Sequence, residues 1–503
     1  MRFTEHNNKL IPEPLAPHDA LSAKPISRLQ TVQTPSVNPD FHYSKELQAT
    51  LQGKQLLLDE LPFPIEQIHS HYEKGYITYR KGIIIEKGHC KCERCGNENE
   101  TFFAAFSCAR CHTECTYCRK CIMLGRVSTC TPLISWTGPA NSNDLPEKIL
   151  HWDGTLSKGQ QRASDAVVQT INENSDLLVW AVCGSGKTEV LFAGIKVALE
   201  AKKRICIATP RTDVVFELVP RLHQAFPPVD VIALYGGSPD RHKFGPLLIS
   251  TTHQLLRYYQ AFDVIIIDEV DAFPYSVEPM LQYAVNQSKK IKSTTIYLTA
   301  TPNKKWQRQV RIGRQNAVII PARFHRHPLP VPTFEWCGNW RKLQLKSRIP
   351  KNIYRWIQSR IDANKQAFLF VPQVDALHEI VTILKKENSR IEGVHAQDQD
   401  RQQKVNAFRT GEITILVTTT ILERGVTVPN IDVAVLGAED KVFTESALVQ
   451  IAGRVGRSAE HPTGEIVFFH YGKTTEMVAA KKQIEKMNRD GKEQGLLEVG
   501  DKI

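Results

Sequence analysis

Two short segments of the chain carry residue types that handle phosphate and the metal ion that accompanies it. The first is AVCGSGKT, in which Gly184 and Gly186 let backbone N–H groups approach phosphate oxygens. Lys187 can reach the β- and γ-phosphates, and Thr188 can ligate Mg²⁺. An apolar run precedes the segment and a helical pattern follows it, as in a phosphate-binding loop, although Ala181 stands where a glycine is usual. We expect an ATP site formed by Ala181, Val182, Cys183, Gly184, Ser185, Gly186, Lys187 and Thr188.

The second segment is DEVD, which begins at Asp268 directly after four aliphatic residues. Such a run predicts a buried strand, so the acidic residues should stand at its carboxyl end. Asp268 is placed to hold Mg²⁺, directly or through water, and Glu269 is placed to polarise the attacking water. Lys187, Asp268 and Glu269 are therefore candidate catalytic residues for nucleotide hydrolysis.

Two arginines near the end of the chain complete the candidate catalytic set. Arg454 and Arg457 lie three residues apart in QIAGRVGR, which predicts that they share one helix face. A guanidinium brought to a γ-phosphate stabilises the charge that develops as the phosphate transfers. We expect both arginines to meet this phosphate across a cleft between two lobes.

The elements that must position these groups follow an α/β rhythm, in which apolar strands alternate with amphipathic segments. This pattern predicts two tandem parallel-sheet lobes. The first has candidate strands at 177–182, 204–209, 229–234, 247–250, 263–267 and 295–299. The second has candidate strands at 367–371, 391–394, 414–418, 432–436 and 464–469.

The rest of the chain divides by composition. Residues 1–40 hold six prolines and one Phe/Tyr/Trp residue, so we expect them to lack a fixed fold. We expect an N-terminal region with a cysteine-rich domain at 41–130, and the polar, proline-containing stretch 131–150 predicts a linker. The ATP-binding lobe should then occupy 151–330 and the C-terminal lobe 331–503.

Charge and hydropathy narrow the class of protein. A net charge of +11 and a pI near 9.0 indicate an acidic partner, most simply nucleic acid. No apolar run approaches the length of a membrane span, and no charged-then-apolar leader opens the chain. We therefore expect neither a transmembrane segment nor secretion.

A basic stretch between Lys289 and Arg360 strengthens the case for nucleic acid. It holds 17 lysines and arginines but one acidic residue, Glu335, and four tryptophans are interleaved with them. Such a stretch is typical of a single-strand path, where cations meet phosphates and rings stack on bases. Some of the tryptophans should instead belong to the core.

Nine of the 12 cysteines fall between Cys90 and Cys130. In a large protein without a secretion signal, closely spaced cysteines favour a metal site over disulfides. Paired Cys-x-x-Cys segments supply the thiolates that tetrahedral Zn²⁺ prefers. The spacing leaves open which four cysteines form each site.

Several segments at the ends of the predicted strands resemble, in order and spacing, motifs I, Ia, Ic, II and III and then IV, V and VI of superfamily-2 helicases. The resemblance covers about residues 155–475 and implies two RecA-like lobes. It also implies that Gln160 contacts adenine, with the adjacent Gln161 as an alternative, and that Pro210-Arg211, Thr251-Thr252 and Thr418–Thr420 meet nucleic-acid phosphates. Besides AVCGSGKT and DEVD, the segments are ATPRTDVVFEL from Ala208, TTHQLLR from Thr251, LTAT from Leu298, FLFVPQV from Phe368, VTTTILERGVTVP from Val417 and QIAGRVGR from Gln450.

CERCG and TYCRKCIMLGRV, placed before such an engine, resemble the late-competence DNA-uptake ATPases of the ComFA family. The resemblance implies a zinc site formed by Cys92, Cys95, Cys118 and Cys121. Cys108, Cys111 and Cys115 are then extra, and they can form a second zinc site with Cys130, Cys90 or His112 or remain free buried thiols.

The resemblance implies an ATP-dependent single-stranded DNA translocase in the cytoplasm, at the inner face of a bacterial membrane, that helps draw in transforming DNA. It implies a DNA-channel protein and a phosphoribosyltransferase-like competence protein as partners, and it allows a homo-oligomer. One alternative is a replication-restart type helicase that unwinds forks. Another is an ATP-gated DNA-binding adaptor that is not a motor.

Overall fold

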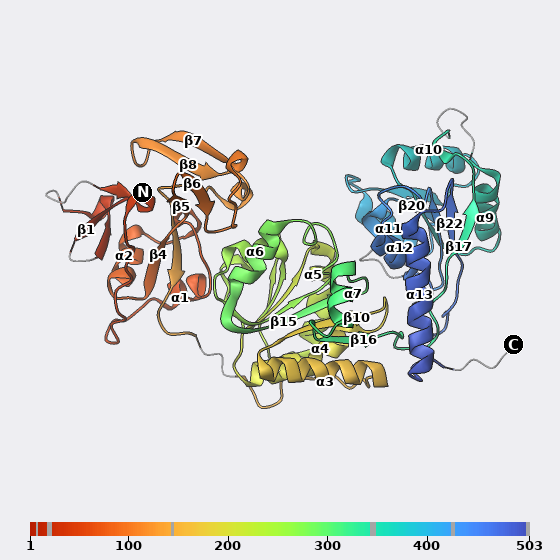
Figure 1. Ribbon diagram of the computed structural model, residues 1–503, viewed down its shortest axis with the longest axis horizontal. Helices are drawn as coiled ribbons and strands as arrows, with labels where there is room; N and C mark the ends of the chain where they lie inside the picture. The colour runs from red at the N-terminus through yellow and green to blue at the C-terminus, as the bar shows by residue number, and fades with distance from the viewer. Residues whose placement is uncertain (7–8, 18–22, 142–144, 343–348, 424–427, 499–503) are drawn as a thin grey trace. The chain divides into compact units, whose positions relative to one another are not determined.

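The computed structural model describes residues 1–6, 9–17, 23–141, 145–342, 349–423 and 428–498 (Figure 1). The chain divides into two compact units. The first comprises Met1–Asp153, Val168–Asp176 and Phe192–Tyr297, and the second comprises Gly154–Val167, Leu177–Leu191 and Leu298–Ile503. Each unit is built around elements that the hydrophobic pattern specifies.

The first unit opens with a folded N-terminal domain, which corrects the expectation of a disordered segment at 1–40. A three-stranded antiparallel sheet has the order β2-β1-β3, and Phe3, Leu10 and Ile26 are buried in the domain core. The prolines do not prevent this fold, because Pro12 and Pro25 lie at the ends of edge strands. The strands are β1 (Arg2–His6), β2 (Lys9–Pro12) and β3 (Lys24–Pro25).

The expected linker at 131–150 is also wrong at its start. Strand β9 (Pro132–Trp136) pairs antiparallel with β4 (Ile77–Lys81), and Leu133 and Ile134 are fully buried. Pro132 is tolerated because it is the first residue of its strand. Helices α1 (Lys45–Leu51) and α2 (Ile65–Glu73) complete this core.

Two antiparallel hairpins carry the cysteine-rich part of the N-terminal domain. The first consists of β5 (Ile83–Glu86) and β6 (His89–Cys92), and the second of β7 (Phe103–Cys108) and β8 (Thr113–Cys118). Alternate residues of a strand share a face, so Cys115 and Cys118, which lie three residues apart on β8, point to opposite faces of the strand.

A seven-stranded sheet with the order β12-β13-β11-β14-β15-β10-β16 carries the phosphate-handling segments. Its strands are β10 (Asp176–Ala181), β11 (Ile205–Thr209), β12 (Val231–Leu234), β13 (Leu247–Thr251), β14 (Phe262–Ile267), β15 (Lys289–Thr299) and β16 (Ala317–Ile320). The accompanying helices are α3 (Lys158–Glu173), α4 (Lys187–Glu200), α5 (Thr212–Ala225), α6 (Pro279–Ser288) and α7 (Lys304–Arg311).

The second unit contains a six-stranded sheet with the order β17-β22-β21-β18-β20-β19, and every neighbouring pair in it is parallel. Alternate residues of β18 feed two cores, since Phe368 and Phe370 pack with α11, α12 and α13 whereas Ala367 and Leu369 pack with α9 and α10. The elements are β17 (Thr333–Trp336), β18 (Ala367–Phe370), β19 (Ile391–Val394), β20 (Ile415–Thr418), β21 (Asp432–Leu436), β22 (Ile466–His470), α9 (Lys351–Asp362), α10 (Val374–Lys385), α11 (Arg401–Arg409), α12 (Glu445–Ala452) and α13 (Thr475–Glu493).

The two sheets confirm the α/β fold class, with two RecA-like lobes preceded by a small cysteine-rich domain. Each predicted strand has a counterpart in the structure, and β16 and β17 are additional strands. Within the residues that the structure describes, no helix is long and apolar enough to cross a membrane.

Candidate nucleotide and metal sites

The phosphate loop joins β10 to α4, and its backbone requires the two glycines. Gly184 and Gly186 have φ angles of 79° and 72°, a region that residues with a Cβ seldom adopt. Helix α4 begins at Lys187, so its first N–H groups and Thr188 lie at the end of the loop. This is the strand–loop–helix arrangement that cradles phosphates.

Gln160 packs against this loop, whereas Gln161 does not. The buried Gln160 side chain donates from Nε2 to the Ser185 carbonyl at 2.9 Å and accepts from the Ser157 backbone at Oε1. Gln161 is exposed and bonds to Asp165 on its own helix. Of the two glutamines, Gln160 is therefore the one that contacts the phosphate loop.

Asp268 and Glu269 directly follow β14, as their sequence predicts. The Asp268 side chain accepts a hydrogen bond from the Glu269 backbone N–H at 2.9 Å. Glu269 has a φ angle of 55°, which is uncommon for a residue with a side chain. Such backbone conformations are found in sites where the surrounding structure holds a side chain in one direction.

The arginines of motif VI are not on a helix face, which corrects that prediction. Helix α12 ends at Ala452, and Arg454 and Arg457 lie in the turn that follows. Gly456 in this turn has a φ angle of 69°, so the backbone between the two arginines is not helical. Arg454 is buried and donates to the Glu423 carbonyl at 3.1 Å, and Arg457 donates to the Gly453 carbonyl at 2.9 Å.

Sequence reasoning missed Arg323, which connects the phosphate loop to the motif VI turn within the second unit. Its buried guanidinium donates to the carbonyls of Cys183, Gly453, Val455 and Gly456. Burial and the neighbouring Arg457 lower the pKa of Arg323 to about 10. In the sequence, Arg323 is one of 17 cations in a basic stretch, so nothing there marks it out.

Cys183 also approaches motif VI closely. Its sulfur lies 3.0 Å from the Gln450 Oε1 atom, and a Cβ atom at Gly453 would lie 2.6 Å from the Cys183 Cβ. The GRVGR segment therefore needs a glycine at 453 for a packing reason. This contact places the loop and the turn side by side.

The basic stretch has a partly structural role. Trp340 and Trp356 are buried and donate to Glu439 and Glu465, whereas Trp336 is 65% exposed. Arg341 and Arg360 are paired with acids that lie far away in the sequence. The exposed cations of the stretch include four on helix α7, which carries no acidic residue: Lys304, Lys305, Arg308 and Arg311.

The threonines expected to meet phosphates are mostly enclosed. Thr251, Thr252 and Thr418 are buried, and the Thr418 hydroxyl donates to the Val394 carbonyl at 3.0 Å. A hydroxyl in this position supports its own sheet and does not reach a nucleic-acid strand through its side chain. Residues 424–427 of motif V lie outside the described residues.

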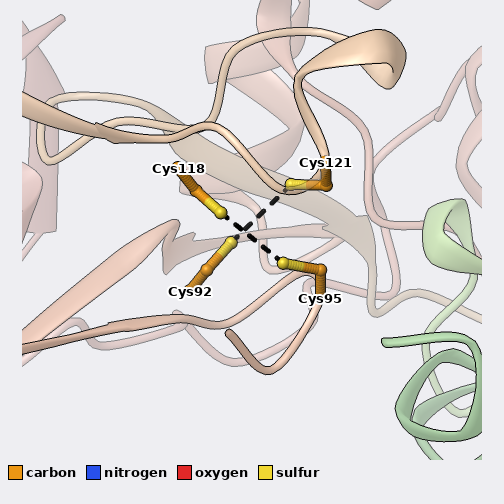
Figure 2. Close-up of side chains that lie close together, drawn as sticks. All are labelled: Cys92, Cys95, Cys118 and Cys121. Atoms are coloured by element: carbon orange, nitrogen blue, oxygen red, sulfur yellow. Dashed lines mark hydrogen bonds between the residues drawn. The ribbon is translucent and has the colours of Figure 1, made fainter. Parts of the chain in front are cut away.

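Cys92, Cys95, Cys118 and Cys121 form a buried cluster, here called the first cluster, with their sulfurs pointing toward one another (Figure 2). The Cys92–Cys121 and Cys95–Cys118 sulfur separations are 3.9 and 3.7 Å. In a tetrahedral zinc site with bonds of about 2.3 Å, sulfurs lie roughly 3.8 Å apart. The ligand set therefore fits Zn²⁺ in chemistry and in spacing.

Arg94, between the first two cysteines, is fully buried behind this cluster. Its Nη2 atom lies 3.3 Å from the Cys121 sulfur and donates to the carbonyls of Cys121 and Gly125, while Nη1 donates to that of Leu124. A guanidinium here offsets the negative charge that four thiolates leave on a bound Zn²⁺ and fixes the turn that carries Cys121.

Cys108, Cys111, Cys115 and Cys130 form a second buried cluster, here called the second cluster. The Cys108–Cys130 and Cys111–Cys115 sulfur separations are 3.7 and 3.1 Å. The structure thus selects Cys130 as the fourth member, while Cys90 and the exposed His112 belong to neither cluster. The extra cysteines are not isolated thiols, and this ligand set also suits Zn²⁺ in its chemistry, with the Cys111–Cys115 separation shorter than in a tetrahedral site.

The N-terminal domain is joined to the segment 192–297 within the first unit. The Glu93 carbonyl accepts from Tyr283 and Gln287 on α6, at 3.3 and 2.7 Å. The buried Glu60 carboxylate pairs with Arg257 at 3.0 Å and with Arg241. These contacts, here called the joint, connect Glu93 beside the first cluster to α6, the helix that follows the DEVD segment, and connect Glu60 to Arg241 and Arg257.

Comparison with protein-family models defines the class of this protein. Residues 158–310 match the DEAD/DEAH box helicase model, and residues 349–459 match the helicase conserved C-terminal domain model. A variant of S. cerevisiae Dbp5 bound to RNA and ADP BeF3 shares the fold, with a TM-score of 0.50 at 16% identity over 67% of this chain and 88% of that chain. The chain is thus a superfamily-2 helicase-like protein with ATP-binding and nucleic-acid-binding lobes.

Residues 36–135 match the model of the competence protein ComFA N-terminal domain. Competence protein ComFA of Bacillus subtilis is 50% identical over 452 residues, covering 90% of this chain and 97% of the relative. The protein of the same name from Streptococcus pneumoniae is 38% identical over 408 residues, covering 80% of this chain and 92% of the relative. The chain belongs to the ComFA family.

Proposed function

We propose that this protein is an ATPase stimulated by single-stranded DNA, which moves along the strand and helps draw transforming DNA into the cell. The observation that carries the proposal is the contact of Arg323 with both the Cys183 carbonyl and the motif VI turn. A nucleotide at the phosphate loop would directly alter this contact. Such a connection is what converts nucleotide turnover into movement.

The residue roles in this proposal follow from the local geometry. Lys187 and the N–H groups of the glycine-rich loop would bind the phosphates, and Thr188 and Asp268 would hold Mg²⁺. Glu269 would accept a proton from the attacking water, and Arg454 and Arg457 would stabilise the charge developing on the γ-phosphate. Gln160 would contact the adenine. ATP and Mg²⁺ supply the reacting phosphate and its charge compensation.

The proposed polynucleotide contact is with phosphates and has no base-specific readout. The net charge is +11, and the exposed cations of α7 face no acid on their own helix. The exposed Trp336 is the member of the four tryptophans most available for stacking on a base. Binding should therefore depend little on sequence and weaken steeply with salt.

The biological setting in this proposal rests on family membership. The partners would be a DNA-channel protein and a phosphoribosyltransferase-like competence protein, with a homo-oligomer also allowed. The protein would work in the cytoplasm at the inner face of the membrane. We place the ATP-binding lobe at 151–330 and the C-terminal lobe at 331–503, after a zinc domain that extends to the end of β9.

The test measures phosphate release with single-stranded DNA, duplex DNA and RNA at several lengths and salt concentrations. Stimulation by single-stranded DNA that rises with length is expected. Lys187→Ala should reduce turnover by roughly a hundredfold or more, because it removes the positive charge that would stabilise the transferring phosphate. Glu269→Gln should retain nucleotide binding and lose turnover. Lys196→Ala, on the exposed side of the same helix α4, is the matched control and should behave as wild type.

Two outcomes would contradict the proposal in different ways. Near-normal turnover of Lys187→Ala would remove the phosphate-loop assignment. Hydrolysis that no single-stranded nucleic acid stimulates would contradict the translocase proposal and favour the ATP-gated DNA-binding adaptor. Unwinding of a tailed duplex would instead favour the replication-restart helicase.

A further inference from the structure

A cavity of about 460 Å³ lies in the first unit, between the N-terminal domain and the segment 199–290. It opens at the amino ends of β11 and β14, because Arg204 directly precedes β11 and Asp263 is the second residue of β14. Asp268 follows the other end of β14, which at six residues is about 20 Å long. This cavity is therefore separate from the phosphate-handling segments.

The cavity wall is strongly cationic. Among its described lining residues there are five cations and one acid: Lys54, Lys202, Lys203, Arg204 and Lys290 against Asp263. Both Asp263 oxygens already accept from Lys290, at 3.0 and 2.9 Å, and one of them also accepts from the Arg204 backbone N–H. The wall thus carries more positive charge than its own acid can balance.

Two of these basic residues are buried, and their side chains donate hydrogen bonds to backbone carbonyls. Arg204 donates to the carbonyls of Gly245 and Gln52 and lies 4.3 Å from the Phe244 ring centroid. Lys54 donates from Nζ to the carbonyls of Arg241 and Lys243, at 3.1 and 3.3 Å. Buried cations are normally paired with anions, because an uncompensated charge inside a protein is costly.

The pKa of Lys54 reflects this lack of balance. Burial lowers the pKa of Lys54 to about 7, with further lowering by Arg204, Arg241 and Arg257. An anion in the cavity would favour the charged form of this lysine. The protein thus holds two buried basic side chains, and an anionic ligand would stabilise their charged forms.

The remaining wall suits a planar group. Trp136, Phe244 and Tyr259 line the cavity together with the cations. Aromatic faces beside cations are the combination that binds a nucleobase and its phosphate together. Gly53 brings its backbone against Arg204, since a Cβ atom at this position would lie 2.6 Å from the guanidinium.

We propose that this cavity binds a nucleotide through its phosphate and its base, at a site separate from the ATP loop. The nucleotide is either free or the terminal residue of a single strand, since both present the same chemistry. This site does not depend on the proposed translocase activity, because its binding can be measured without hydrolysis.

The test is calorimetric titration of the full-length protein with orthophosphate, dTMP, and an oligonucleotide with or without a 5′-phosphate. Lys202→Glu reverses a charge at the wall, and Ala140→Trp fills the cavity without removing a polar group. Each variant should weaken dTMP binding by roughly tenfold or more and leave unstimulated ATPase activity unchanged. Lys87→Glu, a charge reversal at an exposed lysine of the β5–β6 turn, is the matched control.

The outcomes separate the sources and the alternatives. A variant-sensitive preference for the 5′-phosphorylated strand over dTMP supports a strand end, and the reverse preference supports a free nucleotide. Wild-type affinity in both cavity variants would overturn the site. Equal affinities for orthophosphate and dTMP would overturn the role of the aromatic wall. Normal far-ultraviolet dichroism of both variants shows that a loss of binding is not a loss of fold.

Discussion

The two cysteine clusters each contain four cysteines, but they contact different parts of the protein. Beside the first cluster, the Glu93 carbonyl is bound by two side chains of α6, and a Cβ atom at Gly96 would lie 2.5 Å from the Tyr283 ring. Beside the second cluster, the Cys130 carbonyl accepts from the Met1 backbone nitrogen at 2.9 Å, and the Thr129 carbonyl accepts from the Ser27 N–H. One cluster faces the helicase segment, and the other faces its own domain.

This difference shows that two similar cysteine clusters can support different parts of one protein. A metal at the first cluster would fix the surface on which α6 rests, and α6 follows the DEVD segment. A metal at the second cluster would hold the β7–β8 hairpin to the small N-terminal sheet. We therefore expect loss of a metal at the first cluster to affect the proposed ATPase activity, and loss of a metal at the second cluster to affect the stability of the domain.

The largest expected effect comes from removing one ligand of each cluster on the same strand. Cys118→Ser and Cys115→Ser both lie on β8, and each should lower zinc content by roughly one ion per chain. Only Cys118→Ser should also reduce DNA-stimulated ATPase activity, by roughly tenfold or more, because it displaces the support of α6. Elemental analysis and phosphate-release assays measure the two effects.

Cys90→Ser is the control for this pair, because Cys90 belongs to neither cluster and its substitution should change neither quantity. Equal ATPase losses in Cys115→Ser and Cys118→Ser would show that the clusters act together. Full zinc content in Cys115→Ser would remove the second metal site.

A smaller effect is expected from substituting two adjacent acids, of which Glu60 lies in the joint and Asp59 pairs with a residue beside the second cluster. Glu60 is buried in the joint against Arg257, and Asp59 forms an exposed pair at 2.9 Å with Arg110, between Cys108 and Cys111. Glu60→Gln leaves a buried guanidinium without its counter-charge and should lower the free energy of unfolding by about 3 kcal/mol. Asp59→Asn should lower it by less than about 1 kcal/mol. Urea unfolding measures the free energy of unfolding of both variants. Equal losses would mean that the Glu60–Arg257 pair stabilises the protein no more than an exposed pair does.

Lys54, which contacts the Arg241 and Lys243 carbonyls near the joint, should make the free energy of unfolding depend on pH. Lys54 has a pKa of about 7 in the folded protein against an ordinary value of 10.5, chiefly because it is buried. Between these pH values the unfolded chain binds more protons, so the free energy of unfolding should rise with pH from about 7 toward 10. Lys54→Met should reduce this rise. The charged groups around Lys54 are Arg204, Arg241 and Arg257, and Glu60 pairs with the last two.

The measurement for Lys54 is urea unfolding of wild type and Lys54→Met at a series of pH values. The two proteins share every other titratable group, so the difference between their curves reports on Lys54. Parallel curves for the two proteins would contradict the proposed burial of the lysine. A wild-type curve that alone rises would confirm it.

The sequence predicts the lobes well because their strands are short, continuous apolar runs that alternate with amphipathic segments, which is typical of buried parallel strands. It misjudges residues 1–40 because Phe3, Leu10 and Ile26 are too few and too scattered to show a period. Their burial depends on the α1, α2 and β4 residues that cover them. Long-range packing of this kind has no local signal.

The candidate sites divide in the same way. Gly184 and Gly186 can be predicted from the sequence because the phosphate loop requires positive φ angles there. The paired cysteines can be predicted because metal coordination requires their close spacing. Arg323 and Arg94 act through carbonyls that the fold brings near, so their types and positions alone predict nothing. The prediction that Arg454 and Arg457 share a helix face was wrong, because the helix ends at Ala452 and the chain turns at Gly456 with a positive φ angle.

The smallest expected effect tests whether the joint persists in solution. Lys120, between Cys118 and Cys121, pairs at 3.0 Å with Glu278, which precedes the first turn of α6. Because both side chains are partly exposed, a double-mutant cycle of Lys120→Gln and Glu278→Gln should give a coupling of about 0.5 kcal/mol that vanishes in high salt. The coupling should also vanish when Cys118 is serine and persist when Cys115 is serine, since the first cluster alone holds Lys120 in place. Arg119→Gln in place of Lys120→Gln should show no coupling with Glu278. A coupling that survives loss of the first cluster would mean that the two ends of this pair are held by something other than the metal.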